Sequence, residues 1–174
     1  MKIVVLNGSP KGPDSVTMQY IYYWQKRYAS HSYEIINVAQ QLALFEKQRP
    51  AFNAVVEKIE KADFVLWAFP LYFLLVNSQY MRFIELIFER QKTHSFRNTY
   101  AASLSTSIHF FDHTAHNYIH AVCDDLGMNF VGELPAHMQD LTKPAVRSSI
   151  DSVFAHWLDI VESRVPTTPF FAPI

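Results

Sequence analysis

The sequence predicts an α/β domain in which helices cover both faces of a parallel sheet. Short β-branched segments alternate along the chain with longer amphipathic segments, a pattern typical of this class. The first strand-like segment, residues 2–6 (KIVVL), has no polar interruption, as expected of a strand buried on both faces. The 174 residues, of which 49% are hydrophobic, suffice for one domain with a sizeable core.

The remaining elements follow from the periodicity of apolar side chains. Helices are expected at about residues 15–29, 51–62, 77–91, 112–126 and 144–164, and further strands at 33–38, 63–69, 98–105 and 128–132. The second strand, YEIINV, alternates polar and apolar side chains and should lie near an edge of the sheet. Residues 135–141 are expected to make an irregular excursion. We predict one domain over residues 1–165.

The composition excludes several classes of partner. The net charge is −1 and no basic run occurs, which argues against a nucleic-acid partner. Cys123 is the single cysteine, so no disulfide framework can form within the chain. The chain enters its first strand without a signal peptide and has no apolar run long enough to span a bilayer. We therefore expect a cytoplasmic protein with no membrane partner.

The last residues form a separate segment. Residues 166–174 (PTTPFFAPI) are Pro-rich and apolar, and we expect an extended tail. It is either a linker to a further domain or an arm that lies on a partner.

The loop after the first strand combines the features of an anion site. An Asn-Gly turn ends the strand, and the following helix starts at about Ser15. A strand, a Gly/Ser loop and a helix start direct backbone N–H groups at a phosphate. Ser9, Ser15 and Thr17 add hydroxyl groups, and Lys11 adds positive charge. The spacing matches neither the Walker loop nor the dinucleotide fingerprint. An ordinary turn with Ser15 as the helix cap is the alternative.

This stretch resembles the phosphate loop G-S-P-[RK]-x-x-x-S-x-T of flavodoxin-like NAD(P)H-dependent FMN reductases and related iron–sulfur flavoproteins. The match comprises Gly8-Ser9-Pro10-Lys11 and Ser15-Val16-Thr17, with Val16 in place of the usual Asn. Residues 39–50 lack the cysteine cluster of the iron–sulfur branch, and a cluster needs thiolate ligands, so that branch is excluded. The resemblance implies a flavodoxin-like doubly wound five-stranded parallel sheet of order 2-1-3-4-5. It also implies an FMN phosphate bound by Ser9, Lys11, Ser15, Val16 and Thr17.

A second stretch resembles another motif of the same family. The matched residues are Ala62-Asp63, Pro70, Tyr72 and Phe83-Ile84-Glu85, with Leu86 where the family has Arg. Ligands of open α/β sheets bind beyond the carboxyl ends of the strands, so this loop should share a crevice with the first. The resemblance implies that the flavin ring contacts Pro70, Leu71, Tyr72 and Phe73. Alternatively, these aromatic side chains only pack against a neighbouring helix.

A third ligand loop is expected after the strand at residues 98–105. By position it corresponds to the loop that reaches the pyrimidine end of the flavin in this family, and here it offers Ser105, Thr106, Ser107 and His109. His109 belongs to a group with His113, His116 and His120, beside Asp112. Such a group is a metal-ligand pattern in principle, but it lacks an H-E-x-x-H arrangement. We expect no metal and place these histidines at the rim of the site or in a dimer interface.

The resemblance implies an FMN-binding, NAD(P)H-dependent oxidoreductase. FMN would pass electrons from NADPH or NADH to a quinone, a flavin or another small acceptor, without a catalytic side chain. The helix at 77–91 is apolar around its circumference, which predicts a homodimer through this helix. Two alternatives are an electron-transfer module that does not use NAD(P)H and a flavin-free interaction domain. The sequence does not identify the electron acceptor. It also does not distinguish NADH from NADPH as the electron donor.

Overall fold

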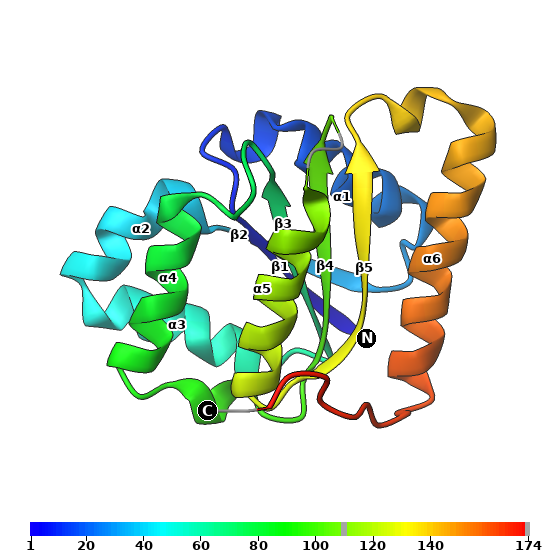
Figure 1. Cartoon of the computed structure of the whole chain (residues 1–174). Helices are drawn as coiled ribbons and strands as arrows, with labels where there is room; N and C mark the ends of the chain where they lie inside the picture. The colour runs from blue at the N-terminus through cyan, green and yellow to red at the C-terminus, as the bar shows by residue number, and fades with distance from the viewer. Residues whose placement is uncertain (109–110, 173–174) are drawn as a thin grey trace.

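The computed structural model describes residues 1–108 and 111–172 and shows one five-stranded parallel sheet between helices (Figure 1). The strand order is β2-β1-β3-β4-β5, which confirms the predicted flavodoxin-like architecture. The strands are β1 (Lys2–Asn7), β2 (Ser32–Asn37), β3 (Phe64–Pro70), β4 (Tyr100–Ser107) and β5 (Asn129–His137). The helices are α1 (Val16–Arg27), α2 (Val38–Lys47), α3 (Arg49–Glu60), α4 (Ser78–Glu89), α5 (Asp112–Asp125) and α6 (Pro144–Glu162). Short 3-10 turns are η1 (Gly12–Asp14), η2 (Thr93–Phe96) and η3 (Asp140–Thr142).

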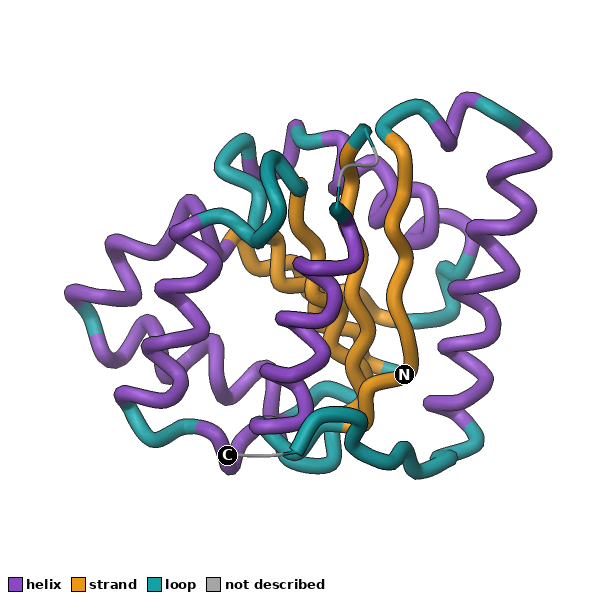
Figure 2. The backbone as a smooth tube through the Cα atoms, viewed as in Figure 1, coloured by secondary structure: helices purple, strands orange, loops and turns teal. Residues whose placement is uncertain are grey.

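The sheet separates two hydrophobic cores. Helices α2 to α5 cover one face, and α1 and α6 cover the other (Figures 1 and 2). On the α1/α6 side, Trp24 stacks on Phe154 with ring centroids 4.2 Å apart. On the other side, Phe45, Phe52 and Phe83 from three helices meet at centroid distances of 5.8 to 6.5 Å. Burial on both faces explains the uninterrupted apolar sequence of β1.

Helix α2 was not predicted. It begins at Val38, where the sequence analysis ended the second strand, and continues through residues that were assigned no element. Val38 and Phe45 are buried and Leu42 packs against the same core, at helical spacing. The apolar stripe is thus short but sufficient to place α2 on the sheet.

Strand β5 is longer than predicted. It continues to His137, so the irregular excursion expected from residue 135 is wrong over its first three residues. Pro135 is compatible with this strand because β5 lies at the edge of the sheet, where one row of N–H groups has no partner strand. A register shift opposite Ala101 and Ala102 accompanies Gly132, whose φ is +150°. A Cβ at Gly132 would lie 2.6 Å from Nε1 of Trp157, so the close packing of α6 requires glycine.

The described part of the tail lies on its own chain. The N–H groups of Phe170 and Phe171 donate to Oδ2 of the buried Asp124 at 3.0 and 2.8 Å. Phe130 of β5 stacks on His120, with ring centroids 4.1 Å apart, and His120 also contacts both tail rings. A linker or an arm on a partner was expected from the sequence, and this contact within the chain was not predicted.

The predicted rim position is wrong for His116. Its side chain is fully buried between α5 and β4, with Nδ1 2.7 Å from Oγ of Ser103 and Nε2 2.8 Å from Oγ of Ser105. Burial lowers the pKa of His116 to about 4, although the nearby Asp112 acts in the opposite direction. Of the other histidines in this group, His113 is exposed, and His109 lies outside the described residues.

The low pKa of His116 predicts a loss of stability in mild acid. As pH falls from about 6.5 to about 4, the unfolded chain takes up a proton that the folded chain does not. The free energy of unfolding therefore decreases, by about 3 kcal/mol from this group. Urea unfolding of wild type and His116→Leu at several pH values measures this contribution.

The variant should lose less stability than wild type over this pH range. His156→Leu, which removes an exposed histidine, is the control and should keep the wild-type pH dependence. Equal slopes for wild type and His116→Leu would contradict the assignment of a neutral buried imidazole.

Candidate functional site

Three predicted loops meet at the carboxyl edge of the sheet, at the top of Figure 1. Together with the end of β5 they enclose a hollow of about 260 Å³. Its lining comprises Ser9, Lys11, Ser15, Val16, Thr17, Pro70, Leu71, Tyr72, Thr106, Ser107, Ile108 and Met138. The fold therefore brings together residues from all three sequence motifs.

Internal hydrogen bonds fix the shape of the first loop. The N–H of Gly8 donates to the carbonyl of Ala68 at 2.7 Å. The N–H of Ser9 donates to Oδ1 of Asn7 at 3.0 Å, and that of Lys11 donates to Oγ of Ser9 at 3.3 Å. These backbone donors are already engaged, although the sequence analysis expected the loop N–H groups to face the phosphate.

The donors that remain for an anion lie at the start of α1 and on two hydroxyl groups. Ser15 caps α1, because its Oγ accepts the N–H of Met18 at 3.3 Å. A hydroxyl that accepts such a bond keeps its own proton for a ligand, which applies to both Ser9 and Ser15. The N–H groups of Val16 and Thr17 are in the first turn, where no intrahelical acceptor exists. These groups can donate hydrogen bonds to an anion, and none of them carries a charge.

The hydroxyl of Thr17 makes a contact within the protein that the sequence did not predict. Its Oγ1 lies 2.6 Å from Oγ1 of Thr106, and both side chains are buried. This bond joins the first turn of α1 to the carboxyl end of β4. One hydroxyl donates to the other, so the pair retains one proton for a ligand.

The mouth of the hollow is apolar. Tyr72, Phe73 and Ile108 are 65%, 67% and 69% exposed, and Met138 is also exposed. Large apolar side chains exposed together around a hollow are typical of a surface that binds a flat apolar group. The exposed cation Lys11 lines the same hollow. The site can thus hold an anionic group at one end and a ring at the other.

Some predicted residues do not line the hollow. Phe73 is exposed and is not among the lining residues, and Ser105 turns its fully buried side chain towards His116 of α5. His109 lies outside the described residues. Ile108 lies in the third predicted loop but was not named as a contact. Met138 was not predicted, since the fifth strand was expected to end at residue 132.

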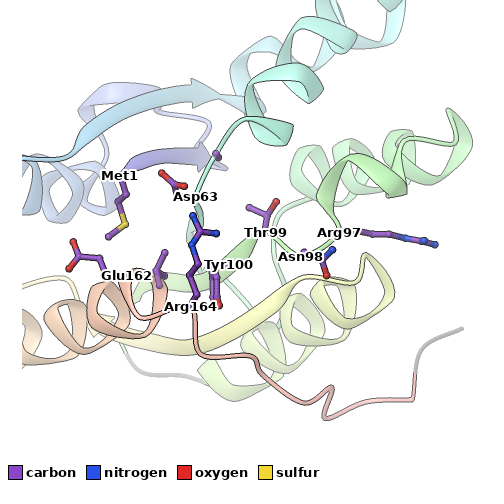
Figure 3. A pocket seen from close by; sticks show the side chains of 10 residues that line it. Met1, Asp63, Arg97, Asn98, Thr99, Tyr100, Glu162 and Arg164 are labelled. Carbon is purple, nitrogen blue, oxygen red and sulfur yellow. The ribbon is translucent and has the colours of Figure 1, made fainter.

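A second hollow, of about 360 Å³, lies at the opposite end of the sheet. Figure 3 shows Asp63, Tyr100 and Arg164 around its centre, while Arg97 points away. None of the residues predicted for cofactor binding lines it. The carboxyl-edge hollow is therefore the candidate site.

Residues 1–108 and 111–172 contain no group of three or more His, Cys, Asp or Glu side chains placed to hold a metal. Among the helices in these two stretches, none is long and apolar enough to cross a membrane.

Solved structures share this fold at low sequence identity. An NADH:FMN oxidoreductase, EMOB, in its apo form has a TM-score of 0.74 and 17% identity, over 90% of this chain and 87% of that one. FerB, an NAD(P)H:acceptor oxidoreductase from Paracoccus denitrificans, has a TM-score of 0.69 and 15% identity over 93% and 97%. An FMN-dependent NADH-azoreductase from Bacillus anthracis, solved with FMN, has a TM-score of 0.62 and 13% identity over 94% and 99%.

Sequence comparison gives the family directly. The model of the NADPH-dependent FMN reductase family matches residues 1–139, most of the chain. Among curated proteins, no sequence matches significantly. The chain belongs to the NADPH-dependent FMN reductase family. It is an NAD(P)H-dependent flavin oxidoreductase with FMN as cofactor, which favours the enzyme over the carrier and the flavin-free domain.

Proposed function

We propose that the carboxyl-edge hollow holds FMN, with the phosphate at the start of α1 and the ring at the apolar mouth. The observation that carries this proposal is the set of free donors on Ser9, Ser15, Val16 and Thr17, next to the cation of Lys11. A dianionic phosphate needs such donors, and a helix start favours negative charge. The apolar side chains at the mouth can pack against the planar flavin ring of FMN.

In this arrangement the side chains bind and orient, and they supply no acid, base or nucleophile. Bound FMN supplies the capacity to accept hydride from NADPH or NADH and to pass electrons on. Tyr72, Phe73 and Ile108 shield part of the ring site while leaving it open to solvent. A small flat acceptor such as a quinone or a flavin fits an opening lined in this way.

We also propose a cytoplasmic location and no nucleic-acid partner. The single cysteine suits a reducing compartment, and the net charge of −1 gives no electrostatic attraction for phosphate backbones.

We also propose a homodimer through α4. Fewer exposed apolar residues of α4 support it than the sequence suggested. Most apolar residues of α4 are buried within the chain itself, and Phe88 is the large one that stays exposed, at 41%. Phe88 borders a groove between α4 and α5, lined by Ile84, Glu85, Phe88, Glu89, Tyr118, Val122 and Asp125. The groove contains acidic side chains, and Arg82 offsets part of their negative charge by pairing with Glu85 and Glu89. A second copy packing through this groove would cover Phe88.

A negative charge introduced at residue 15 tests the proposed position of the FMN phosphate. Ser15→Asp keeps a good helix cap but adds negative charge beside the proposed phosphate. We expect the Kd for FMN to rise by about a hundredfold or more, because like charges a few ångströms apart cost several kcal/mol near a protein surface. Riboflavin, which lacks the phosphate, should lose little affinity. Quenching of flavin fluorescence measures both.

Ser15→Asn is the matched control, because it is also a good cap and is neutral. It should bind FMN far better than Ser15→Asp does. Equal FMN affinity in the two variants would place the phosphate elsewhere.

The molecular mass of the protein in solution tests the proposed dimer. Light scattering at micromolar concentration should give the mass of two chains for wild type and of one chain for Phe88→Asp, because the charge would be buried without a partner. Phe170→Asp alters another exposed apolar residue and should remain a dimer. A single-chain mass for wild type would refute the dimer.

A further inference from the structure

We propose that Asn77 is a positioning residue that sets the spacing between the two halves of the FMN site. It joins the ring loop (residues 71–77) to the phosphate loop (residues 8–15). This role rests on the proposed placement of FMN in the carboxyl-edge hollow.

The side chain of Asn77 makes two different hydrogen bonds. Its Oδ1 accepts the N–H of Tyr80 at 3.0 Å and caps the start of α4. Its Nδ2 donates to the carbonyl oxygen of Gly8 in the phosphate loop. One amide group therefore holds the end of the ring loop, the first turn of α4 and the phosphate loop together.

Tyr80 reinforces this contact from the same turn of α4. Its hydroxyl donates to the carbonyl of Leu6 at 2.6 Å. Its ring lies so close to Gly8 that a Cβ there would be 2.9 Å from two ring atoms. Gly8 is thus required for the close approach of α4 to the phosphate loop. The first turn of α4 supports that loop from the core side.

The ring loop is fixed at both ends, and part of it between them is exposed. At one end, the N–H of Leu71 donates to the carbonyl of Thr106 at 3.0 Å. At the other end, Asn77 donates to Gly8. Between these points Tyr72 and Phe73 are exposed, and Leu74 has a φ of +60°, which is uncommon for a residue other than glycine. The Asn77 side chain is therefore the anchor that a substitution can remove.

A ligand that spans both loops benefits from their fixed spacing, whereas a ligand that touches one loop does not. Binding is stronger when the protein holds its contacts in place beforehand, because less ordering is needed on association. FMN spans both loops in the proposed placement, and riboflavin contacts the ring loop without filling the phosphate loop. Loss of the Asn77–Gly8 bond should therefore weaken FMN binding selectively.

The decisive variant is Asn77→Ser. Serine is as good a helix cap as asparagine, but it lacks the amide N–H that bonds Gly8. We expect the Kd for FMN to rise about tenfold, the scale of one hydrogen bond that positions a charged ligand. The Kd for riboflavin should change by less than about twofold. Because the cap persists, the thermal unfolding temperature should stay close to that of wild type.

Ser78→Ala is the control for the neighbouring position. Ser78 is exposed, and its hydroxyl donates to Oε1 of the adjacent Gln79 at 3.3 Å, so both flavin affinities should match wild type. Equal weakening of FMN and riboflavin in Asn77→Ser would overturn the positioning role, as would an unchanged FMN affinity. If wild type binds FMN no better than riboflavin, the proposed phosphate site fails and this role fails with it. A wild-type preference for FMN that persists in Asn77→Ser overturns the role of Asn77 alone.

Discussion

Asn7 at the end of β1 pairs in register with Ala68 of β3, and Pro70 at the end of β3 pairs with Thr106 of β4. This parallel register of three neighbouring strands places three carboxyl ends at one edge of the sheet. The loops that follow them are up to about ninety residues apart in sequence, yet they line one hollow, as the Thr17–Thr106 contact shows. The rest of the site depends on this register. A shift in any of these strands would separate the hydrogen-bond donors at the start of α1 from the apolar side chains at the mouth of the hollow.

The phosphate loop is held mainly by uncharged groups. Two asparagines, Asn7 and Asn77, bond the backbone of Gly8 and Ser9, and these bonds fix the loop before any ligand binds. The hydroxyls of Ser9 and Ser15 then have protons to donate, and the helix start adds its own N–H groups. A loop that is ordered in advance loses little entropy when a phosphate binds. Val16, where the family has Asn, removes one possible donor from this set.

The sequence and its family resemblance were sufficient for the strand order and for most of the residues that line the carboxyl-edge hollow. The apolar run of β1, the Gly/Ser loop and the aromatic loop after β3 each carry local signals, and the rule for open α/β sheets places their loops together. Helix α2 was missed because its apolar stripe is short, and the end of β5 because Pro135 disfavours a strand anywhere but an edge. His116 was placed at the surface since imidazole is polar, and only the tertiary structure supplies Ser103 and Ser105 as partners. The Thr17–Thr106 and Asn77–Gly8 contacts likewise join segments that are distant in sequence.

The central claim is that these loops form an FMN site that works with a reduced nicotinamide. The most direct measurement is to load the purified protein with FMN, remove unbound flavin, and add NADH or NADPH without oxygen. The account predicts that the yellow absorbance of the bound flavin disappears with at least one nicotinamide and returns when a quinone is added. A protein that retains no FMN, or whose bound FMN keeps its colour with both nicotinamides, would contradict it.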